Sequence, residues 1–370
     1  MKEKSQTALI AALQFLHVAG WAAYFALTRQ VYNEDTRFLV RLAAAETLPT
    51  ALGLLGAFAA ERWGYRRVIS LGVVEGTFLA LAGAFIRKPS ALLATSFTAS
   101  LLWSIAGPQI YGYTLTLTSR SGRILGTVLA GSTLGWSVGS LVAPIAAEVL
   151  GDPRVVLIAG GVAAAAAYAV LAAIASNTKP SRAGGGGDGK AAVLAALMLT
   201  SSLALAGSEI IGSVYMAKLS RELGTVGYSI ANSASGFIGA AARPLVGHLV
   251  DVVAPSKVLA ATLAAYSLYV AALHISHGIV MAVLWVIPLF QLLDTSLYKL
   301  SSALVGEARG VAAVNSSYSL AGALVMFLSV LNLGEGGYAV AAALLFLTSS
   351  ALTLAISRRW YGMGSKAETI

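Results

Sequence analysis

The stretch Glu61-Arg62-Trp63-Gly64-Tyr65-Arg66-Arg67 carries one acid and three bases around a glycine, and long apolar segments flank it on both sides. Such dense charge between apolar segments is typical of a tight loop that joins two membrane helices and is anchored among lipid headgroups. A weaker version of the pattern follows about 190 residues later, where Gly247 and Asp251 precede Lys257. Two acid-then-base loops of this kind indicate a duplicated helix bundle.

The overall composition favours a chain that lies mostly within a membrane. Hydrophobic residues make up 57% of the sequence and charged residues 11%, whereas soluble domains carry about 25% charged residues. The apolar segments are roughly 19 to 27 residues long, enough to cross a hydrocarbon core of about 30 Å as helices. They lack the strict alternation of membrane strands. We therefore predict an all-α polytopic membrane protein.

The charge and the cysteine content narrow the function classes. A formal net charge of +9 would suggest nucleic acid binding in a soluble protein, but the bases here lie between apolar segments, where they orient membrane helices. The absence of cysteine excludes disulfides, thiolate metal sites and cysteine nucleophiles. Lys2 and Lys4 before an apolar segment resemble a signal peptide. That segment continues to about Leu27 without a clear cleavage site, and we interpret it as a retained first span.

The apolar segments predict about twelve spans, with short connections that make successive helices neighbours. Between the sixth and seventh spans, residues 176–190 contain Pro180 and a run of glycines, which is typical of a flexible linker. We predict a six-helix bundle over residues 1–175, a cytoplasmic linker over 176–190, a second bundle over 191–357 and a cytoplasmic tail over 358–370. The predicted spans are residues 8–28, 39–60, 68–86, 91–117, 124–150, 155–175, 191–217, 229–250, 258–276, 279–305, 311–333 and 338–357.

Basic residues also predict the orientation of the chain. Lys and Arg are more frequent in the loops on the side of the N-terminus than in the opposite loops. Because cytoplasmic loops are enriched in these residues, we expect both termini in the cytoplasm and a multi-pass protein of the cell membrane. We expect a monomer whose partners are the lipid bilayer, a small-molecule substrate and protons, with no cofactor, metal or nucleic acid.

Glycines mark the fifth predicted span, where Gly131, Gly135 and Gly139 are four residues apart. This spacing puts them on one helix face, where they permit close contact with another helix. The connection before this span, residues 119–126, resembles the connection at residues 306–313. The two halves of the sequence therefore match at a second place.

Together these features resemble the major facilitator superfamily of secondary transporters over the whole chain. The superfamily's loop between helices two and three follows the pattern G-x-x-x-D-R-x-G-x-R-R. Here glutamate replaces the aspartate, and alanine stands at the first glycine. Gly247 and Asp251 occupy the corresponding positions in the second half. The last five specified positions of the pattern are held by Glu61, Arg62, Gly64, Arg66 and Arg67.

The resemblance implies two parallel six-helix repeats with a substrate site near the membrane midplane. Helices one, four, seven and ten would line this site, and rocking of the halves would expose it to the two sides in turn. The resemblance also implies a cytoplasmic gate, with Glu61 near a helix N-terminus of the other half and with Arg62 and Arg66 in ion pairs. The alternative is that these charges only anchor the loop and orient the protein.

Polar side chains within the spans mark candidate sites, because an ionisable group in hydrocarbon costs about 2.5 to 3.5 kcal/mol on insertion scales. Positions 14, 17, 21 and 24 are polar or aromatic and share one face of the first helix, as expected for a stripe beside a wet cavity. His17 either contacts substrate or forms a structural hydrogen bond. The predicted substrate-binding residues are Gln14, His17, Trp21, Tyr24, Trp103, Gln109, Arg243 and Gln291.

Three acids are candidates for proton coupling: Glu209, Asp294 and Glu46. Glu209 follows small residues that allow the seventh helix to open, and a carboxyl in a low-dielectric site binds protons more readily. The alternative for Glu209 is an interhelical ion pair. Asp294 is also placed to pair with Lys299, and Glu46 with Arg41. Glu75 is a secondary candidate without a predicted partner.

Arg243 precedes Pro244 and Gly247 in the eighth span. This is similar to the monocarboxylate porter branch of the superfamily, in which an arginine at that place meets the substrate carboxylate. A guanidinium suits the role because it stays charged and binds two oxygens at once. The aspartate that the branch has four residues earlier is replaced by Gly239. The alternatives are that Arg243 reaches the cytoplasmic surface or pairs with Asp251.

The leading hypothesis is a proton-coupled secondary transporter of a small organic solute. An organic anion or monocarboxylate symporter would use Arg243 and His17, whereas an exporter of amphipathic compounds would exchange protons at Glu209 or Glu46. A membrane receptor or assembly factor of the same fold is the alternative from another class. An enzyme is not expected, because no P-loop, metal-ligand set or nucleophile triad is visible. The aromatic side chains expected in an exporter are Trp21, Tyr24, Trp103, Tyr111 and Tyr113.

Overall fold

A computed structural model describes residues 3–32, 38, 42, 45–117, 121–180, 189–331 and 333–364. This part of the chain consists of helices and short turns and contains no strand, as the all-α prediction requires. Its first half comprises α1 (Glu3–Val31), η1 (Leu48–Leu52), α3 (Gly53–Trp63), α4 (Tyr65–Ala84), α5 (Pro89–Leu115), α6 (Ser121–Leu150) and α7 (Pro153–Ile174). Its second half comprises α8 (Gly189–Ile210), η2 (Ile211–Tyr215), α9 (Met216–Val252), α10 (Pro255–Ile275), α11 (Gly278–Trp285), α12 (Leu289–Val305), α13 (Glu307–Val330) and α14 (Glu335–Gly364).

Nine helical segments within the described residues are long and apolar enough to cross a membrane. The other three predicted spans correspond to η1 with α3, to α9 and to α13. These elements lie against the opposite half of the molecule, α13 on η1 and α3, and α9 on α6. Of these elements, α3 is only 11 residues long, and much of the predicted span before it lies outside the described residues. Helices that face such an interface also carry polar residues, for example Arg243 in α9 and Asn315 in α13.

Two helices change their backbone form at membrane depth. The tenth predicted span, 279–305, is interrupted, because α11 ends at Trp285 and α12 begins at Leu289. Pro288 lies in this break, where its missing N–H and fixed ring stop the helix. The seventh span changes to a π-helix in η2. Irregular backbone at this depth is tolerated where it lines a cavity, and π-helical turns are frequent at functional sites.

Two predicted boundaries differ from the structure. α9 begins at Met216 and therefore includes the residues predicted to connect spans seven and eight. α14 continues to Gly364, past the predicted start of the tail at residue 358. Apolar patterns locate the hydrocarbon-embedded part of a helix, whereas backbone hydrogen bonding continues beyond it. Residues 181–188 of the predicted linker and 365–370 of the predicted tail lie outside the described residues.

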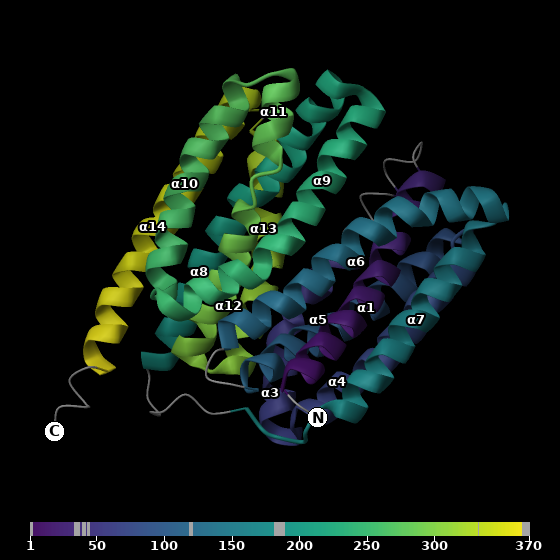
Figure 1. Ribbon diagram of the computed structural model, residues 1–370, viewed down its shortest axis with the longest axis horizontal. Coiled ribbons are helices and arrows are strands. Elements are labelled where there is room, and N and C mark those ends of the chain that lie inside the picture. Colours follow the sequence, from purple (N-terminus) through teal and green to yellow (C-terminus); the bar gives the residue numbers. More distant parts are fainter. Residues whose placement is uncertain are drawn as a thin grey trace.

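The helices form two bundles, with α6 of the first beside α9 of the second (Figure 1). We call the end that contains Trp63, Gly122 and Val252 the closed end, and the opposite end the open end. The bundles approach each other toward the closed end, where α1 begins and α14 ends, and their open ends point apart in Figure 1. Within the first bundle, the glycine stripe of α6 faces α1 so closely that added Cβ atoms would overlap the α1 backbone, as its spacing predicts.

Gly64 makes the turn between α3 and α4 at the closed end. Its φ of 86° and ψ of 160° belong to a region that only glycine adopts without strain. A Cβ at this position would also meet Asn177, which follows α7. The next residue, Tyr65, donates its backbone N–H to the carbonyl of Thr178 at 3.2 Å. The turn is therefore packed against the first residues of the predicted linker.

We expect Gly64→Ala to destabilise the protein by about 3 kcal/mol, since backbone strain of about 1 to 3 kcal/mol adds to overpacking of about 1 to 3 kcal/mol. Gly151→Ala is the matched control, because Gly151 has a φ of 68° but a Cβ added there would have nothing within 4 Å. Thermal melting in detergent should show a clearly larger loss for Gly64→Ala. Equal losses would mean that contact with Asn177 has no part in the requirement for glycine.

Candidate functional site

A cavity of about 630 Å³ lies between the bundles and is lined by α6 together with helices of the second half. The π-helical turn contributes Gly212 and the break in the tenth span contributes Ile287, so both irregular segments border the cavity. Hydroxyl groups and aromatic rings dominate its wall. They include Ser132, Thr133, Ser137, Ser140, Ser208, Ser235, Trp136, Tyr266, Tyr269, Trp285, Phe290 and Tyr318.

Arg243 is the charged side chain in the lining of this cavity among the described residues, and it is only 4% exposed. Its Nη1 donates to Oδ2 of Asp294 at 2.8 Å, and its Nε donates to Oγ1 of Thr133 at 2.7 Å. Arg243 belongs to α9, Asp294 to α12 and Thr133 to α6, so these contacts join the two bundles. A buried pair is stable only while both partners are present, because each charge has lost its water.

The predicted partners of these charges are wrong. Asp294 pairs with Arg243 and not with Lys299, whereas Lys299 donates to Asp251 at 3.0 Å. Arg243 neither reaches the surface nor pairs with Asp251. The prediction relied on neighbours in sequence, but partners on separate helices are decided by how those helices are rotated and packed.

Gln291 also lines the cavity, and its amide lies beside Gly239 so closely that a Cβ there would overlap it. Gly239 is the position at which the monocarboxylate branch has an aspartate. An aspartate at this position would collide with Gln291 in the present packing. The carboxylate near Arg243 is instead supplied by Asp294 on α12, which belongs to the tenth span that the resemblance places at the substrate site.

His17 and Trp21 point into the first bundle and not into the cavity. His17 Nε2 lies 2.8 Å from Oε1 of Glu75, and Trp21 Nε1 donates to the same oxygen at 2.6 Å. The His17 ring packs edge-on against Tyr168 with 4.6 Å between ring centroids. Glu75, which is fully buried, therefore has two partners that the sequence did not reveal. This part of the predicted stripe on α1 faces α4 instead of a wet cavity.

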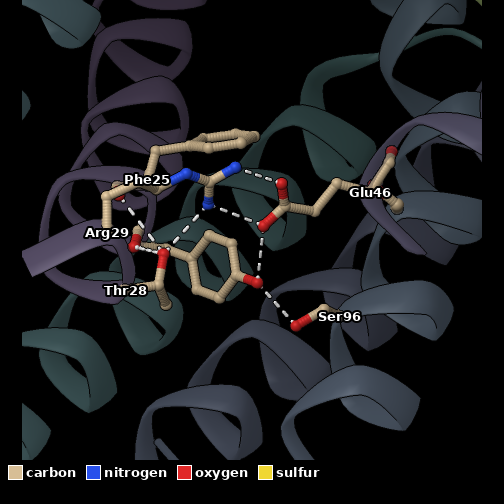
Figure 2. A network of polar contacts seen from close by, with 7 residues as sticks. Phe25, Thr28, Arg29, Glu46 and Ser96 are labelled. Atoms are coloured by element: carbon tan, nitrogen blue, oxygen red, sulfur yellow. Dashed lines mark hydrogen bonds and ion pairs between the residues drawn. The ribbon is translucent and has the colours of Figure 1, made fainter. Parts of the chain in front are cut away.

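A second polar network joins α1 to the following span (Figure 2). Arg29 forms a bidentate ion pair with Glu46, with 2.8 Å between Nη1 and Oε1. The Tyr24 hydroxyl donates to the same Glu46 oxygen at 2.8 Å and contacts Ser96 Oγ at 2.6 Å. The partner found for Glu46 is thus Arg29, whereas the predicted partner Arg41 lies outside the described residues.

Gln14 lies directly behind the wall of the cavity. Its Oε1 accepts a hydrogen bond from Ser132 Oγ at 3.4 Å, and Ser132 is a lining residue. The Tyr111 hydroxyl contacts the same Ser132 at 3.1 Å. Gln14 and Tyr111 therefore position a lining hydroxyl and do not themselves border the cavity.

Trp103, Gln109 and Tyr113 of α5 do not line the cavity either. Trp103 packs against a buried hydrophobic cluster within the first bundle. The side-chain amide of Gln109 is fully buried and forms no hydrogen bond with the described residues. The Tyr113 hydroxyl accepts a hydrogen bond from Gln6 at 2.8 Å near the closed end. The fourth span therefore contributes these side chains to the bundle interior, whereas the prediction placed them at the cavity.

Glu209 has an exposed side chain and directly follows Ser208, a lining residue. The π-helical segment begins two positions later at Ile211. Glu209 is therefore adjacent to the cavity and to the widened helix but separate from the Arg243–Asp294 pair. Its part in proton coupling stays a prediction.

At the closed end, Glu61 reaches the other half of the molecule. Arg309 donates to its carboxylate from Nε at 2.5 Å and from Nη2 at 2.7 Å. Arg309 stands in the first turn of α13, so Glu61 lies beside a helix N-terminus of the opposite bundle, where a negative charge is favourable. Arg62 and Arg66, which were predicted to form ion pairs, have none with any residue that the structure describes.

Asp251 makes the corresponding contact from the second half. Its carboxylate accepts the backbone N–H groups of Gly122 at 3.0 Å and Arg123 at 2.9 Å, in the first turn of α6. Lys299 adds the ion pair to the same carboxylate. Gly247 allows this approach, because a Cβ there would overlap the Gly122 carbonyl. We call the contacts of Glu61 and Asp251 across the interface the latch.

No protein-family model and no curated protein matches the sequence. The fucose:proton symporter FucP of E. coli is similar in structure, with a TM-score of 0.72 and 13% identity over 96% of this chain and 100% of that protein. FucP in an outward conformation gives a TM-score of 0.73 and 13% identity, with 95% and 98% covered. The proton:xylose symporter XylE gives 0.69 and 12%, with 97% and 95% covered. The chain has the major facilitator superfamily fold.

Within this superfamily fold, sequence reasoning identified part of the cavity wall. Helices one, four, seven and ten were expected to line it. The seventh and tenth spans do so, helices one and four do not, and α6 and α9 supply much of the remaining lining. One signal was present in α6, where the hydroxyl residues Thr133, Ser137 and Ser140 lie away from the face that carries the glycines. Hydroxyls on a face that does not pack against α1 are expected where a helix borders a polar cavity.

Because charge-assisted hydrogen bonds are worth about 1.5 to 3 kcal/mol, we expect Asp251→Asn to shift the balance between closed and open latch by roughly thirtyfold. The chain has no cysteine, so spin labels at Val149→Cys and Ile279→Cys report the separation of the open ends. Both sites are exposed, at 80% and 78%. Pulsed electron spin resonance should show more molecules with short label distances in the variant.

The control for this measurement is Glu335→Gln, which removes an exposed ion pair with Arg221 inside the second half. It should leave the distance distribution unchanged. If Asp251→Asn and Glu61→Gln also leave it unchanged, the carboxylates anchor their loops and do not hold the closed end.

Proposed function

We propose that the protein is a secondary active transporter of a small organic anion, in which the Arg243–Asp294 pair couples the solute to a proton. The observation that carries this proposal is a buried guanidinium at the wall of the cavity between the bundles, held by a carboxylate of its own half and a hydroxyl of the other. The fold it shares with two proton symporters supports proton coupling.

The coupling follows from charge balance at a buried site. The Arg243–Asp294 pair is neutral as a unit, and adding a carboxylate would leave an excess negative charge in a low-dielectric region. A proton on Asp294 removes that excess and releases the guanidinium to bind the substrate carboxylate through two oxygens. Anion and proton would therefore be bound together and released together, as a symporter requires.

In this proposal the latch controls from which side of the membrane the cavity is open. We place the closed end at the cytoplasm, in keeping with the basic residues of its loops. With Glu61 and Asp251 in contact with the opposite half, solute would enter the cavity from the open end. Rocking of the bundles would then break the latch and open the cavity to the other side.

A second candidate is a proton-antiporting exporter of amphipathic compounds. The aromatic wall favours it, because rings such as Trp136, Tyr269 and Trp285 bind apolar and cationic solutes. Glu209, exposed beside the π-helical turn, would then exchange the proton. The two candidates make different predictions: the anion symporter requires Arg243 for function, and the exporter requires Glu209.

In proteoliposomes, with acetate, lactate and benzoate as probes, we expect Arg243→Gln to weaken uptake about thirtyfold or more, from the loss of charge-assisted hydrogen bonds of about 1.5 to 3 kcal/mol. Asp294→Asn should retain carboxylate exchange across the membrane, because the guanidinium stays available. It should lose accumulation driven by a pH gradient. Arg154→Gln is the matched control, since Arg154 is exposed, forms an ion pair with the nearby Asp152 and does not line the cavity.

Folding is separated from binding by the double variant Arg243→Gln with Asp294→Asn. Removing one partner of a buried pair costs about 3 to 5 kcal/mol, whereas replacing both is close to neutral. The double variant should therefore melt near the unchanged protein and still fail to take up the probes. Carboxylate uptake by this variant would refute the anion proposal, and loss of transport in Glu209→Gln alone would favour the exporter.

A further inference from the structure

A second cavity, of about 550 Å³, lies on the outside of the first bundle between α4 and α7. Its lining includes Arg66, Arg67 and Ser70 from the first turns of α4 and Asn177 from the segment after α7. These residues are at the closed end, on helices that are long and apolar enough to span the membrane. The cavity shares no lining residue with the one between the bundles.

The polar part of this cavity is cationic and lacks an acid. Arg66 and Arg67 are both exposed, and neither has an ion pair with the residues described here. The acid of the same loop, Glu61, is already held by Arg309 in the other half. Two guanidinium groups beside the N-terminus of α4, with the Asn177 amide opposite, form a site suited to a phosphate group.

The lining changes from polar to apolar with depth. Ser70 lies one turn into α4, and Val73 lies one turn further from the loop. On α7 the wall is made by Ala169, Ala172 and Ala173, whose small side chains leave a groove. A charged head at the membrane boundary and an apolar groove leading into the hydrocarbon are the shape of a lipid, whereas a free phosphate would need only the head.

We propose that this cavity is a binding site for an anionic phospholipid, with its phosphate held by Arg66 and Arg67 and an acyl chain along Val73 and the α7 alanines. The site adjoins the turn at Gly64, which packs against Asn177. A bound lipid would therefore fix the α3–α4 turn against the start of the predicted linker and stabilise the closed end of the first bundle. This proposal is independent of what the protein transports.

The test is binding of dioleoyl phosphatidylglycerol to the full chain in detergent, measured by native mass spectrometry and by thermal melting. Each basic residue near an anionic surface contributes about 1 kcal/mol, which is about fivefold in affinity. Arg66→Gln with Arg67→Gln should therefore weaken lipid binding by roughly 25-fold and remove most of the lipid-induced rise in melting temperature. High salt should weaken binding to the unchanged protein.

Two single variants serve as controls, and combined they remove the same two charges as the double variant. Arg62→Gln alters the same loop outside the cavity, and Lys257→Gln alters the corresponding loop of the second half; both side chains are exposed. Both should keep the lipid affinity. Ala173→Leu fills the groove without removing charge and should also lose the lipid, so the proposal stays testable if the double variant folds poorly.

The proposal is overturned if phosphatidylcholine binds as tightly as phosphatidylglycerol, or if the double variant keeps its lipid affinity. It is overturned equally if inorganic phosphate or glycerol phosphate stabilises the protein as much as the lipid does, since the groove would then have no part in binding. If Ala173→Leu retains the lipid, the groove likewise has no part in binding and the proposal is overturned.

Discussion

Two carboxylates at the closed end hold the halves of the molecule together. Glu61 and Asp251 each end a helix of one bundle and contact the first turn of a helix in the other. Unpaired backbone N–H groups and the helix dipole make such a turn favourable for a negative charge. Since the two contacts occupy corresponding positions in the two halves, they fix the bundles at one end only. The opposite ends are left apart, and the cavity between the bundles depends on that separation.

The Arg243–Asp294 pair at the cavity depends on the close packing of α6 against α9. Gly126 lies one turn from Gly122 on α6, and its added Cβ would overlap the backbone carbonyl of Arg243. Close contact between α6 and α9 therefore begins at the latch and extends toward the cavity, where it brings Thr133 within 2.7 Å of the guanidinium. If the latch is lost, movement of α6 and α9 would therefore alter the contacts of Arg243, even though no residue in contact with Arg243 is substituted.

The sequence was sufficient for features that repeat or that act locally. The charged loop at Gly64, its weaker copy at Asp251 and the glycine stripe of α6 each follow from spacing along one chain segment. The partners of Glu46, Glu75 and Asp294 did not follow, because each lies on another helix and is selected by helix rotation. Pro288 is present in the sequence, but apolar residues on both sides of it made residues 279–305 look like one continuous span. Lining by α6 was missed although its hydroxyls share one face, because the resemblance placed the cavity on helices one, four, seven and ten. On α9, Arg243 was predicted at the site but its neighbours in the lining were not.

The arrangement of the buried acids bears on which of them responds to movement between the halves. Glu75 is held by His17 and Trp21, and Glu46 by Arg29 and Tyr24, and all of these partners belong to the first bundle. Rigid rotation of the bundles leaves those networks intact. Asp294 differs, because its partner Arg243 is also bound to Thr133 of the opposite bundle. When α6 and α9 separate, the guanidinium loses a hydrogen bond that only this conformation provides, and its hold on Asp294 changes with it. Under the proposed rocking of the halves, Asp294 is thus the one of these three acids whose surroundings change, as the proposed proton coupling requires.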